Sequence, residues 1–305
     1  MDTLKTLTYE VTARIARIML NRPERGNGIT LEMPAELAAC VECANLDPNV
    51  HVIALAGNGK GFCGGYDLVV SAEQRLGLEQ DLTSWPTGSP MDARVQLANH
   101  DPDQTWDPIL DYAMMSRNVR GFMSLFYSDK PVICKVHGFC VAGGTDMALC
   151  SDLLVIEDKA SIGYPPARVW GVPTTALWAY RIGVEKAKRL LFTGDCLTGT
   201  QALEWGLATD APPGDRLEAR FESLLERVSR LPINQLVMMK LLINQTVLGQ
   251  SLQSSQMLGT IFDGIARHTR EGYAFQKRAT EVGFKQAVKE RDEPFADSKP
   301  VPDKA

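Results

Sequence analysis

The chain has 305 residues, of which 45% are hydrophobic and 23% are charged, and its formal net charge is −5 at pH 7. This composition is typical of a globular protein that buries a substantial core. Because the basic residues are scattered along an acidic chain and no apolar run is long enough to span a bilayer, we expect neither a nucleic-acid nor a membrane partner.

The first part of the chain predicts strands that lead into glycine-rich turns. Residues 7–20 alternate roughly between apolar and polar side chains and end at Asn21-Arg22-Pro23, which predicts a hairpin or strand pair closed by a turn. Helical spacing over 31–46 is followed by a buried strand over 50–56, which runs directly into the glycine cluster at 57–65. The backbone N–H groups of such a loop can face a ligand.

The same pattern returns after residue 130. Residues 131–136 predict a strand, 137–144 a glycine turn, 146–150 the opening of a helix and 153–157 another strand. Between the two patterns, residues 69–126 are polar and rich in turns before a helical stretch, so we interpret this segment as an extended insertion.

The second half of the chain predicts helices. Short helical segments follow Thr174, and longer helical patterns extend over 215–230, 234–248 and 254–290. Neither glycine loop matches the phosphate-binding patterns of dinucleotide- or nucleotide-binding folds. We therefore predict an α/β spiral in which residues 1–210 form the core with the active site and residues 211–305 form a helical region.

The seven cysteines are odd in number and lie mostly in apolar segments. We expect reduced, buried thiols and no metal site, since Cys40 and Cys43 lack a second pair or a neighbouring histidine. The first residues lack a basic segment followed by an apolar one, so we expect a cytoplasmic protein.

Five segments, in this order and spacing, resemble the crotonase, or enoyl-CoA hydratase/isomerase, superfamily. They are 21–27 (NRPERGN), 61–68 (GFCGGYDL), 130–138 (KPVICKVHG), 142–148 (AGGTDMA) and 191–207 (LFTG, then Ala202 and Gly206-Leu207). The resemblance covers nearly the whole chain. It implies a spiral of ββα repeats, a C-terminal helical region used in trimerisation, and a homotrimer or a hexamer made of two trimers. It also implies an acyl-CoA thioester substrate, with coenzyme A as part of that substrate and no separate cofactor.

The resemblance assigns an oxyanion hole to the two glycine turns. An enolate forms at the thioester when its α-carbon loses a proton or its β-carbon is attacked, and two backbone N–H groups stabilise the charge. By motif position these donors would belong to Gly64 and Gly143, the latter at the start of a helix, where free N–H groups favour an anion.

The resemblance also assigns residues to coenzyme A. Arg25 matches a position near the phosphates, and Tyr66 and Asp67 follow the first loop near the adenine and pantetheine. Phe262 resembles an aromatic residue that packs on the adenine, of the same or of a neighbouring subunit.

The predicted acid–base groups depart from the family pattern. Hydratases of this family place two glutamates beside the double bond, and the corresponding residues here are Asp146 and Pro166. Aspartate is shorter by about 1 Å, and proline cannot titrate, so the two-carboxylate mechanism cannot be carried over intact. Tyr164 and Arg168 are the nearest polar side chains, and period two in an extended segment would place both on the same face as residue 166.

These residues leave several activities open. Hydration of a 2-enoyl-CoA is the first choice, with Asp146 as the main proton-transfer group. Double-bond isomerisation, hydrolysis or decarboxylation of the thioester, and a weakly catalytic CoA-binding paralogue are the alternatives. Trp85, Trp106 and Tyr112 in the insertion indicate an apolar wall for a bulky or long acyl group. We interpret Lys135, a lysine in an apolar strand, as part of a structural ion pair.

Overall fold

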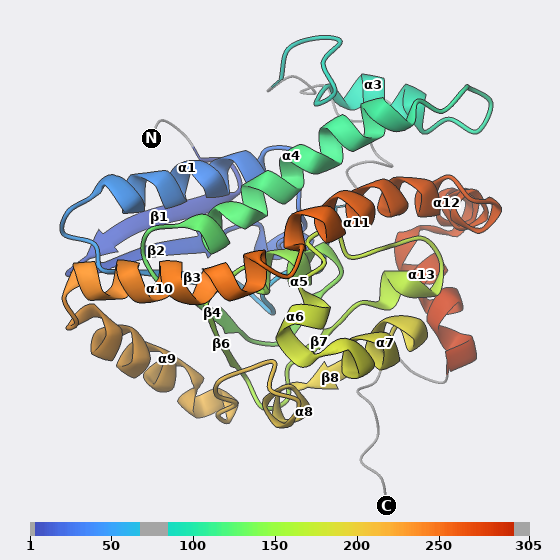
Figure 1. Cartoon of the computed structure of the whole chain (residues 1–305). Coiled ribbons are helices and arrows are strands. Elements are labelled where there is room, and N and C mark those ends of the chain that lie inside the picture. Colours follow the sequence, from blue (N-terminus) through green and yellow to red (C-terminus); the bar gives the residue numbers. More distant parts are fainter. Residues whose placement is uncertain (1–3, 68–84, 296–305) are drawn as a thin grey trace, which may run out of the picture.

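The computed structural model describes residues 4–67 and 85–295, so Leu68 and the first part of the predicted insertion lie outside the described residues. The larger of its two sheets has the strand order β1-β2-β3-β4-β6 (Figure 1). The hairpin β1–β2 is antiparallel, as predicted, and the other neighbours pair in parallel. The strands are β1 (Leu7–Thr12), β2 (Ile15–Leu20), β3 (Val52–Gly57), β4 (Val132–Val136) and β6 (Leu153–Ile156).

A second, three-stranded sheet was not predicted. Its order is β5-β7-β8, and its strands are β5 (Phe139–Val141), β7 (Ser161–Gly163) and β8 (Cys196–Thr198). Strands of three residues are too short to produce a period-two pattern. An isolated bridge between Cys63 and Cys140 joins the first glycine loop to β5, and this link brings the two glycine turns together.

Helices cover both faces of the larger sheet. On one face, Ile53 and Leu55 of β3 belong to the core cluster that contains α1 (Met33–Leu46) and α4 (Pro108–Tyr127). On the other face, the alternate residues Val52 and Ala54 pack with Phe221 of α9 (Gly214–Ser229). Lys135 pairs with Glu218 of α9, which confirms the predicted structural ion pair.

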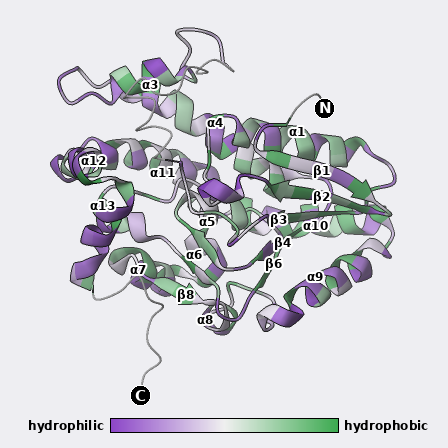
Figure 2. Ribbon diagram, turned by 180° about the vertical axis from the view of Figure 1, so that it is seen from behind, coloured by the Kyte–Doolittle hydropathy of each residue, from purple (hydrophilic) through white to green (hydrophobic). Residues whose placement is uncertain are grey.

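The long helical pattern predicted over 254–290 is three helices, α11 (Leu252–Arg267), α12 (Arg270–Val282) and α13 (Phe284–Asp292). Thr269 caps the start of α12 through its side chain, and Gly283, with a φ of +84°, ends it. Figure 2 shows α12 and α13 as largely hydrophilic. The remaining helices are α3 (Ala93–Asn99), α5 (Gly143–Ala148), α6 (Trp178–Ile182), α7 (Val184–Thr193), α8 (Gly199–Glu204) and α10 (Ile233–Leu248), with 3-10 turns η1 (Pro23–Arg25), η2 (Pro165–Arg168) and η3 (Glu293–Phe295).

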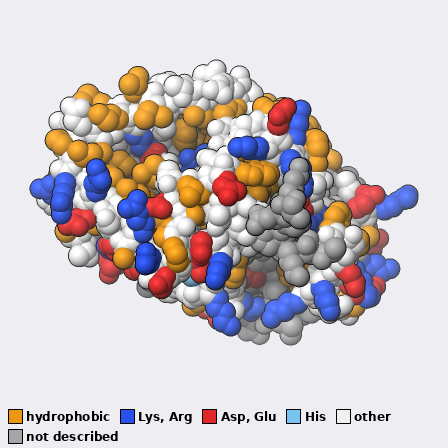
Figure 3. All heavy atoms as spheres, turned by 90° about the horizontal axis from the view of Figure 1, so that it is seen from below, with side chains coloured by type: hydrophobic (Ala, Val, Ile, Leu, Met, Phe, Trp, Pro, Cys, Tyr) orange, Lys and Arg blue, Asp and Glu red, His pale blue; other side chains and the backbone are white. Residues whose placement is uncertain are grey.

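The charged residues form a mixed surface. On the face seen in Figure 3, basic and acidic side chains of the described residues are interspersed. No helix within residues 4–67 and 85–295 is long and apolar enough to cross a membrane.

Candidate active site

The two glycine turns pack directly against each other. Val141 donates its N–H to the carbonyl of Cys63 at 3.0 Å. A Cβ built on Gly144 would lie 2.6 Å from that same carbonyl oxygen, and one built on Gly65 would lie 2.7 Å from the Cβ of Ala142. The contact is therefore closed to larger side chains, and both turns present their backbones to one place.

The structure corrects the predicted oxyanion donor in the first turn. Gly64 donates its N–H to the carbonyl of Gly26 at 3.0 Å, so this donor already has an acceptor. Ile29 bonds to Gly65 and Asp67 on either side of Tyr66, at 2.8 and 3.0 Å, which directs the Tyr66 N–H to the opposite side. That N–H has no acceptor among the described residues, so Tyr66 replaces Gly64 as the candidate donor.

Gly143 lies at the start of a helix, as predicted. It is the first residue of α5, where N–H groups have no acceptor within the helix. A Cβ here would lie 2.8 Å from the ring of Tyr66 and 3.0 Å from Ile29, so a side chain would displace the first turn. Ala142, just before Gly143, has a φ of +55°. This strained backbone conformation turns the start of α5 toward the first glycine turn.

Asp146 is fully buried one turn into α5. Its Oδ1 accepts two hydrogen bonds from Thr175, from the N–H at 2.9 Å and from the hydroxyl at 2.7 Å. Its Oδ2 is buried and makes no hydrogen bond of normal geometry with the described residues, although the Thr174 hydroxyl interacts with the carboxyl group and opposes the rise of its pKa. Burial raises the pKa of Asp146 to about 7, although the Thr175 hydrogen bonds oppose the rise. A carboxyl group with such a pKa can take up and release a proton near neutral pH.

A second buried carboxylate comes from α11 and was missed in the sequence. Asp263 accepts a hydrogen bond from the N–H of Val172 at 3.3 Å and pairs with Arg267 at 3.1 Å. Arg267 also binds Asp111 of α4 at 2.9 Å. Burial raises the pKa of Asp263, and its negative charge contributes to the rise at Asp146. The loop 172–175 thus connects the two acids.

The composition of α11 explains why Asp263 and Arg267 were not predicted as buried residues. Its buried side carries Leu252 at the start of the helix, then Gln256, Gly259, Thr260, Asp263 and Gly264, whereas Met257, Leu258, Ile261, Phe262 and Ile265 are exposed. A charged stripe on a helix normally indicates the solvent face. The only sequence signal is that Asp263 and Arg267 share this stripe with two glycines, which allow close packing.

Tyr164 and Arg168 separate in the structure, because residues 165–168 form a 3-10 turn and not an extended segment. Two adjacent prolines favour this turn, so the expectation that both side chains share a face with residue 166 is wrong. Tyr164 is buried, and the charge of Asp146 adds to the effect of burial in raising its pKa. Arg168 instead binds Asp195 and Asp292 at 3.3 and 3.1 Å, which gives it a structural role near α13.

The residues predicted to bind coenzyme A lie in different environments. Arg25 is exposed at the end of η1, next to Gly26, which accepts the Gly64 hydrogen bond. Asp67 pairs with Arg22 at 2.8 Å. Phe262 is 48% exposed on α11, whereas the neighbouring Asp263 is buried. The hydroxyl of Tyr66 is buried, and burial together with the charge of Asp146 raises its pKa.

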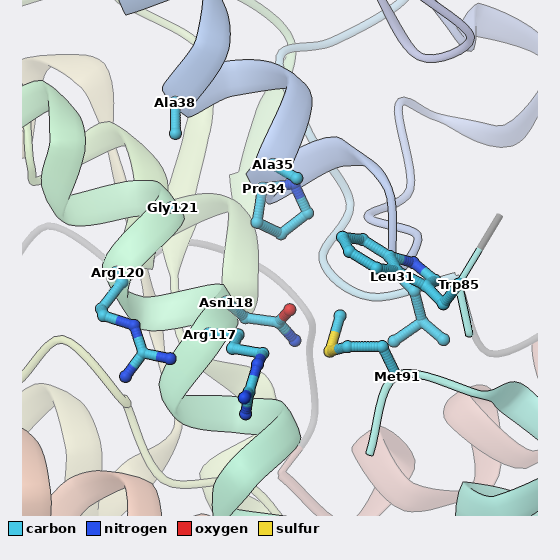
Figure 4. Close-up of a pocket in the computed structure, with 10 residues that line it drawn as sticks. All are labelled: Leu31, Pro34, Ala35, Ala38, Trp85, Met91, Arg117, Asn118, Arg120 and Gly121. Carbon is cyan, nitrogen blue, oxygen red and sulfur yellow. The ribbon is translucent and has the colours of Figure 1, made fainter. Parts of the chain in front are cut away.

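A cavity of about 200 Å³ lies between α1 and α4, close to this group. Figure 4 shows Leu31, Trp85 and Met91 on one side of it, with Asn118 reaching toward them from α4. Asn118 is buried, and it is close enough to Tyr66 to influence the pKa of the phenol. Arg117 and Arg120 of α4 also line the cavity, so an apolar wall faces polar side chains of α4. Trp106, by contrast, stacks on His268, with the ring centroids 4.4 Å apart.

Together these groups suit chemistry at a thioester. Two backbone donors from separate turns meet beside a buried carboxyl group that titrates near neutral pH. Within residues 4–67 and 85–295, no group of three His, Cys, Asp or Glu side chains is arranged to hold a metal ion. The arrangement can stabilise an oxyanion and transfer a proton beside it.

Comparison with known proteins identifies the family of the chain. The family model for enoyl-CoA hydratase/isomerase matches residues 10–98 and 107–281. A putative enoyl-CoA hydratase of Thermus thermophilus is 28% identical over 87% of this chain and 95% of its own length. The 1,2-epoxyphenylacetyl-CoA isomerase of Escherichia coli is 28% identical over 79% of this chain and 82% of its own.

A solved structure is more similar. The crystal structure of an enoyl-CoA hydratase from Mycobacterium smegmatis superposes with a TM-score of 0.90 at 54% identity, over 98% of this chain and 97% of that chain. The fold is therefore the crotonase fold, as predicted. The protein belongs to the enoyl-CoA hydratase/isomerase family of enzymes, within the crotonase superfamily.

Proposed function

We propose that this protein is an acyl-CoA enzyme that hydrates 2-enoyl-CoA thioesters, with Asp146 as its acid–base group. The observation that carries the proposal is the buried Asp146 carboxyl group, with a pKa of about 7, next to the free N–H groups of Tyr66 and Gly143. The thioester oxygen accepts both N–H groups, and the enolate that forms at the α-carbon is stabilised there. Asp146 transfers the proton between the α-carbon and the oxygen at the β-carbon.

Double-bond isomerisation is the second candidate. It moves one proton between two carbons, so a single carboxyl group is sufficient, and Pro166 stands where the second glutamate of the family would be. The relative from Escherichia coli is named as an isomerase of a CoA ester. Hydrolysis or decarboxylation of the thioester would use the same oxyanion site.

Steady-state assays of the purified protein with crotonyl-CoA and with a 3-enoyl-CoA test the proposal. We expect turnover of crotonyl-CoA to 3-hydroxybutyryl-CoA. Turnover of the 3-enoyl ester alone would favour the isomerase. Binding of CoA esters without turnover of any thioester would instead identify a CoA-binding paralogue.

We also propose that the cavity between α1 and α4 takes the acyl chain. Its apolar lining includes Leu31, Pro34, Trp85 and Met91, and Asn118 connects it to Tyr66. Replacing Ala38, another lining residue, with leucine is expected to lower kcat/KM for long or bulky 2-enoyl-CoA esters roughly tenfold, because the added carbons fill the space. Crotonyl-CoA should be affected less than about twofold.

The neighbouring Ala39 is exposed on the same helix and provides the control. Ala39→Leu is expected to leave the chain-length preference unchanged. Equal losses for short and long substrates in Ala38→Leu would contradict the assignment of the cavity.

We further propose that the chain assembles as a trimer, alone or as half of a hexamer. Helices α10 and α11 expose apolar side chains on neighbouring segments, and patches of this kind mark protein interfaces. They are Met238, Met239, Leu241, Leu242, Ile243, Met257, Leu258, Ile261, Phe262 and Ile265. In a trimer, Phe262 and the exposed Arg25 would reach coenzyme A from adjacent subunits. A monomer in sedimentation equilibrium at micromolar concentration would rule this out.

Coenzyme A would enter only as part of the substrate, with no separate cofactor. None of the described cysteines forms a disulfide, which suits a reducing compartment such as the cytoplasm.

A further inference from the structure

The side chain of Tyr66 carries a buried hydroxyl group that makes no hydrogen bond of normal geometry within the described residues, and Asn118 is a side chain that interacts with it. The Tyr66 ring lies against Gly143, where a built Cβ would come within 2.8 Å of it. The residue as a whole is partly accessible, but its hydroxyl oxygen is buried, and no group of the described residues lies in normal hydrogen-bond geometry to it. Buried hydroxyl groups in native proteins almost always have a partner, so such a group points to a ligand atom.

Two other polar atoms near this hydroxyl are in the same situation. Oδ2 of Asp146 and Oδ1 of Asn118 are both buried and make no hydrogen bond of normal geometry within the described residues. They come from two different helices, α5 and α4, and both side chains influence the pKa of the Tyr66 phenol. Unsatisfied atoms from three elements around one site suggest that a polar part of the substrate, and not only its apolar chain, is held here.

We propose that the Tyr66 hydroxyl donates a hydrogen bond to the oxygen at the β-carbon of the substrate, and so selects hydration of 2-enoyl-CoA over isomerisation. This oxygen belongs to the water that adds to the double bond, or to the hydroxyl group that leaves in the reverse direction. The proposal rests on the proposed function, because it uses the same oxyanion site. Since the Tyr66 N–H is a candidate donor to the thioester oxygen, one residue would fix the positions of both substrate oxygens.

The step is balanced without a further reagent. In the direction of dehydration, Asp146 removes the α-proton, and the C–H electron pair forms the enolate. The enolate then re-forms the thioester carbonyl as the C–O bond at the β-carbon breaks. The proton held by Asp146 passes to the departing hydroxyl group, which leaves as water. Tyr66 remains protonated throughout, in keeping with its raised pKa, and acts only as a hydrogen-bond donor.

The test uses Tyr66→Phe, which removes only the hydroxyl group. We expect kcat for hydration of crotonyl-CoA to fall roughly 10- to 100-fold. Exchange of the α-protons of butyryl-CoA in D2O needs Asp146 and the N–H groups but no β-oxygen, so its rate should stay within about threefold. A purely structural role would lower both rates together.

Tyr9→Phe is the matched control, because Tyr9 packs against the core from β1, near Cys40 and Cys43 of α1. It should change neither rate. An unchanged hydration rate in Tyr66→Phe, or equal losses of hydration and exchange, would overturn the proposal. A wild-type protein that turns over no thioester but exchanges the α-protons of butyryl-CoA would contradict the proposed hydration itself, independently of Tyr66.

Binding to the wild-type protein gives a second readout that does not depend on the variant folding. We expect 3-hydroxybutyryl-CoA to bind about tenfold more tightly than butyryl-CoA, since only the former offers an oxygen to Tyr66. Equal affinities of the two esters would contradict the assigned hydrogen bond.

Discussion

Replacing Asp146 with asparagine is expected to lower kcat by ~10²- to 10⁴-fold and to leave the affinity for acyl-CoA esters nearly unchanged. Asparagine can still accept the two hydrogen bonds from Thr175 through its amide oxygen, so the geometry of the loop 172–175 is retained. It cannot accept or release the catalytic proton. Measurement of kcat and of the dissociation constant for a saturated acyl-CoA separates these two effects.

Asp210→Asn is a suitable control, because Asp210 lies before α9 and pairs with Arg220 at the surface. Its rate should equal that of the wild-type protein. A rate for Asp146→Asn within about threefold of the wild type would show that another group moves the proton.

The pH dependence follows from the raised pKa of Asp146. The group acts as a base only when ionised, so kcat/KM for α-proton removal is expected to rise as the pH increases through about 7 and then to level off. The groups around Asp146 that influence this value include Asp263, which raises it, and Thr175, which lowers it.

The same pKa affects stability with a definite sign. Because the folded-state pKa is about 7 and the ordinary value is 3.8, the folded protein binds more protons between these values. The stabilisation from the neutral group is complete below about pH 4 and is lost as the pH rises through 7. Asp146→Asn is therefore expected to be more stable than the wild type at pH 8, by up to a few kcal/mol, so a loss of activity there would not reflect unfolding.

Replacing Arg267 with methionine is expected to have the largest effect on stability. Its guanidinium group is mostly buried and pairs with Asp111 and Asp263, whose side chains are 3% and 10% exposed. Removing the cation leaves two carboxylates buried without a counter-charge, which costs about 3–5 kcal/mol of the free energy of unfolding. Urea denaturation at a fixed protein concentration measures this change.

Arg278 of α12 offers a comparison, because it forms ion pairs with Glu281 and Glu290 at the surface. Arg278→Met is expected to leave the urea midpoint unchanged. Adding Asp263→Asn to Arg267→Met should recover part of the lost stability, since it removes one of the unpaired charges. A double variant less stable than Arg267→Met alone would argue against this electrostatic explanation.

Much of the fold was predictable because it depends on short-range pattern. The alternation over residues 7–20 gave the β1–β2 hairpin, and the apolar runs before the glycine turns gave β3 and β4. Asp146 follows the second turn in the sequence, so its place in the first turn of α5 required no tertiary information. In contrast, β5, β7 and β8 have three residues each and form only because neighbouring strands are brought to them.

The sequence by itself therefore determined the fold family, the order of the two glycine turns and the position of Asp146 beside them. Only the tertiary structure decided which backbone N–H groups are free, because the carbonyl that accepts the Gly64 N–H belongs to Gly26, in another turn. It also decided that the face of α11 with Asp263 and Arg267 is buried while its apolar face is exposed. A helical pattern defines two faces, but which face is covered depends on elements far away in the chain.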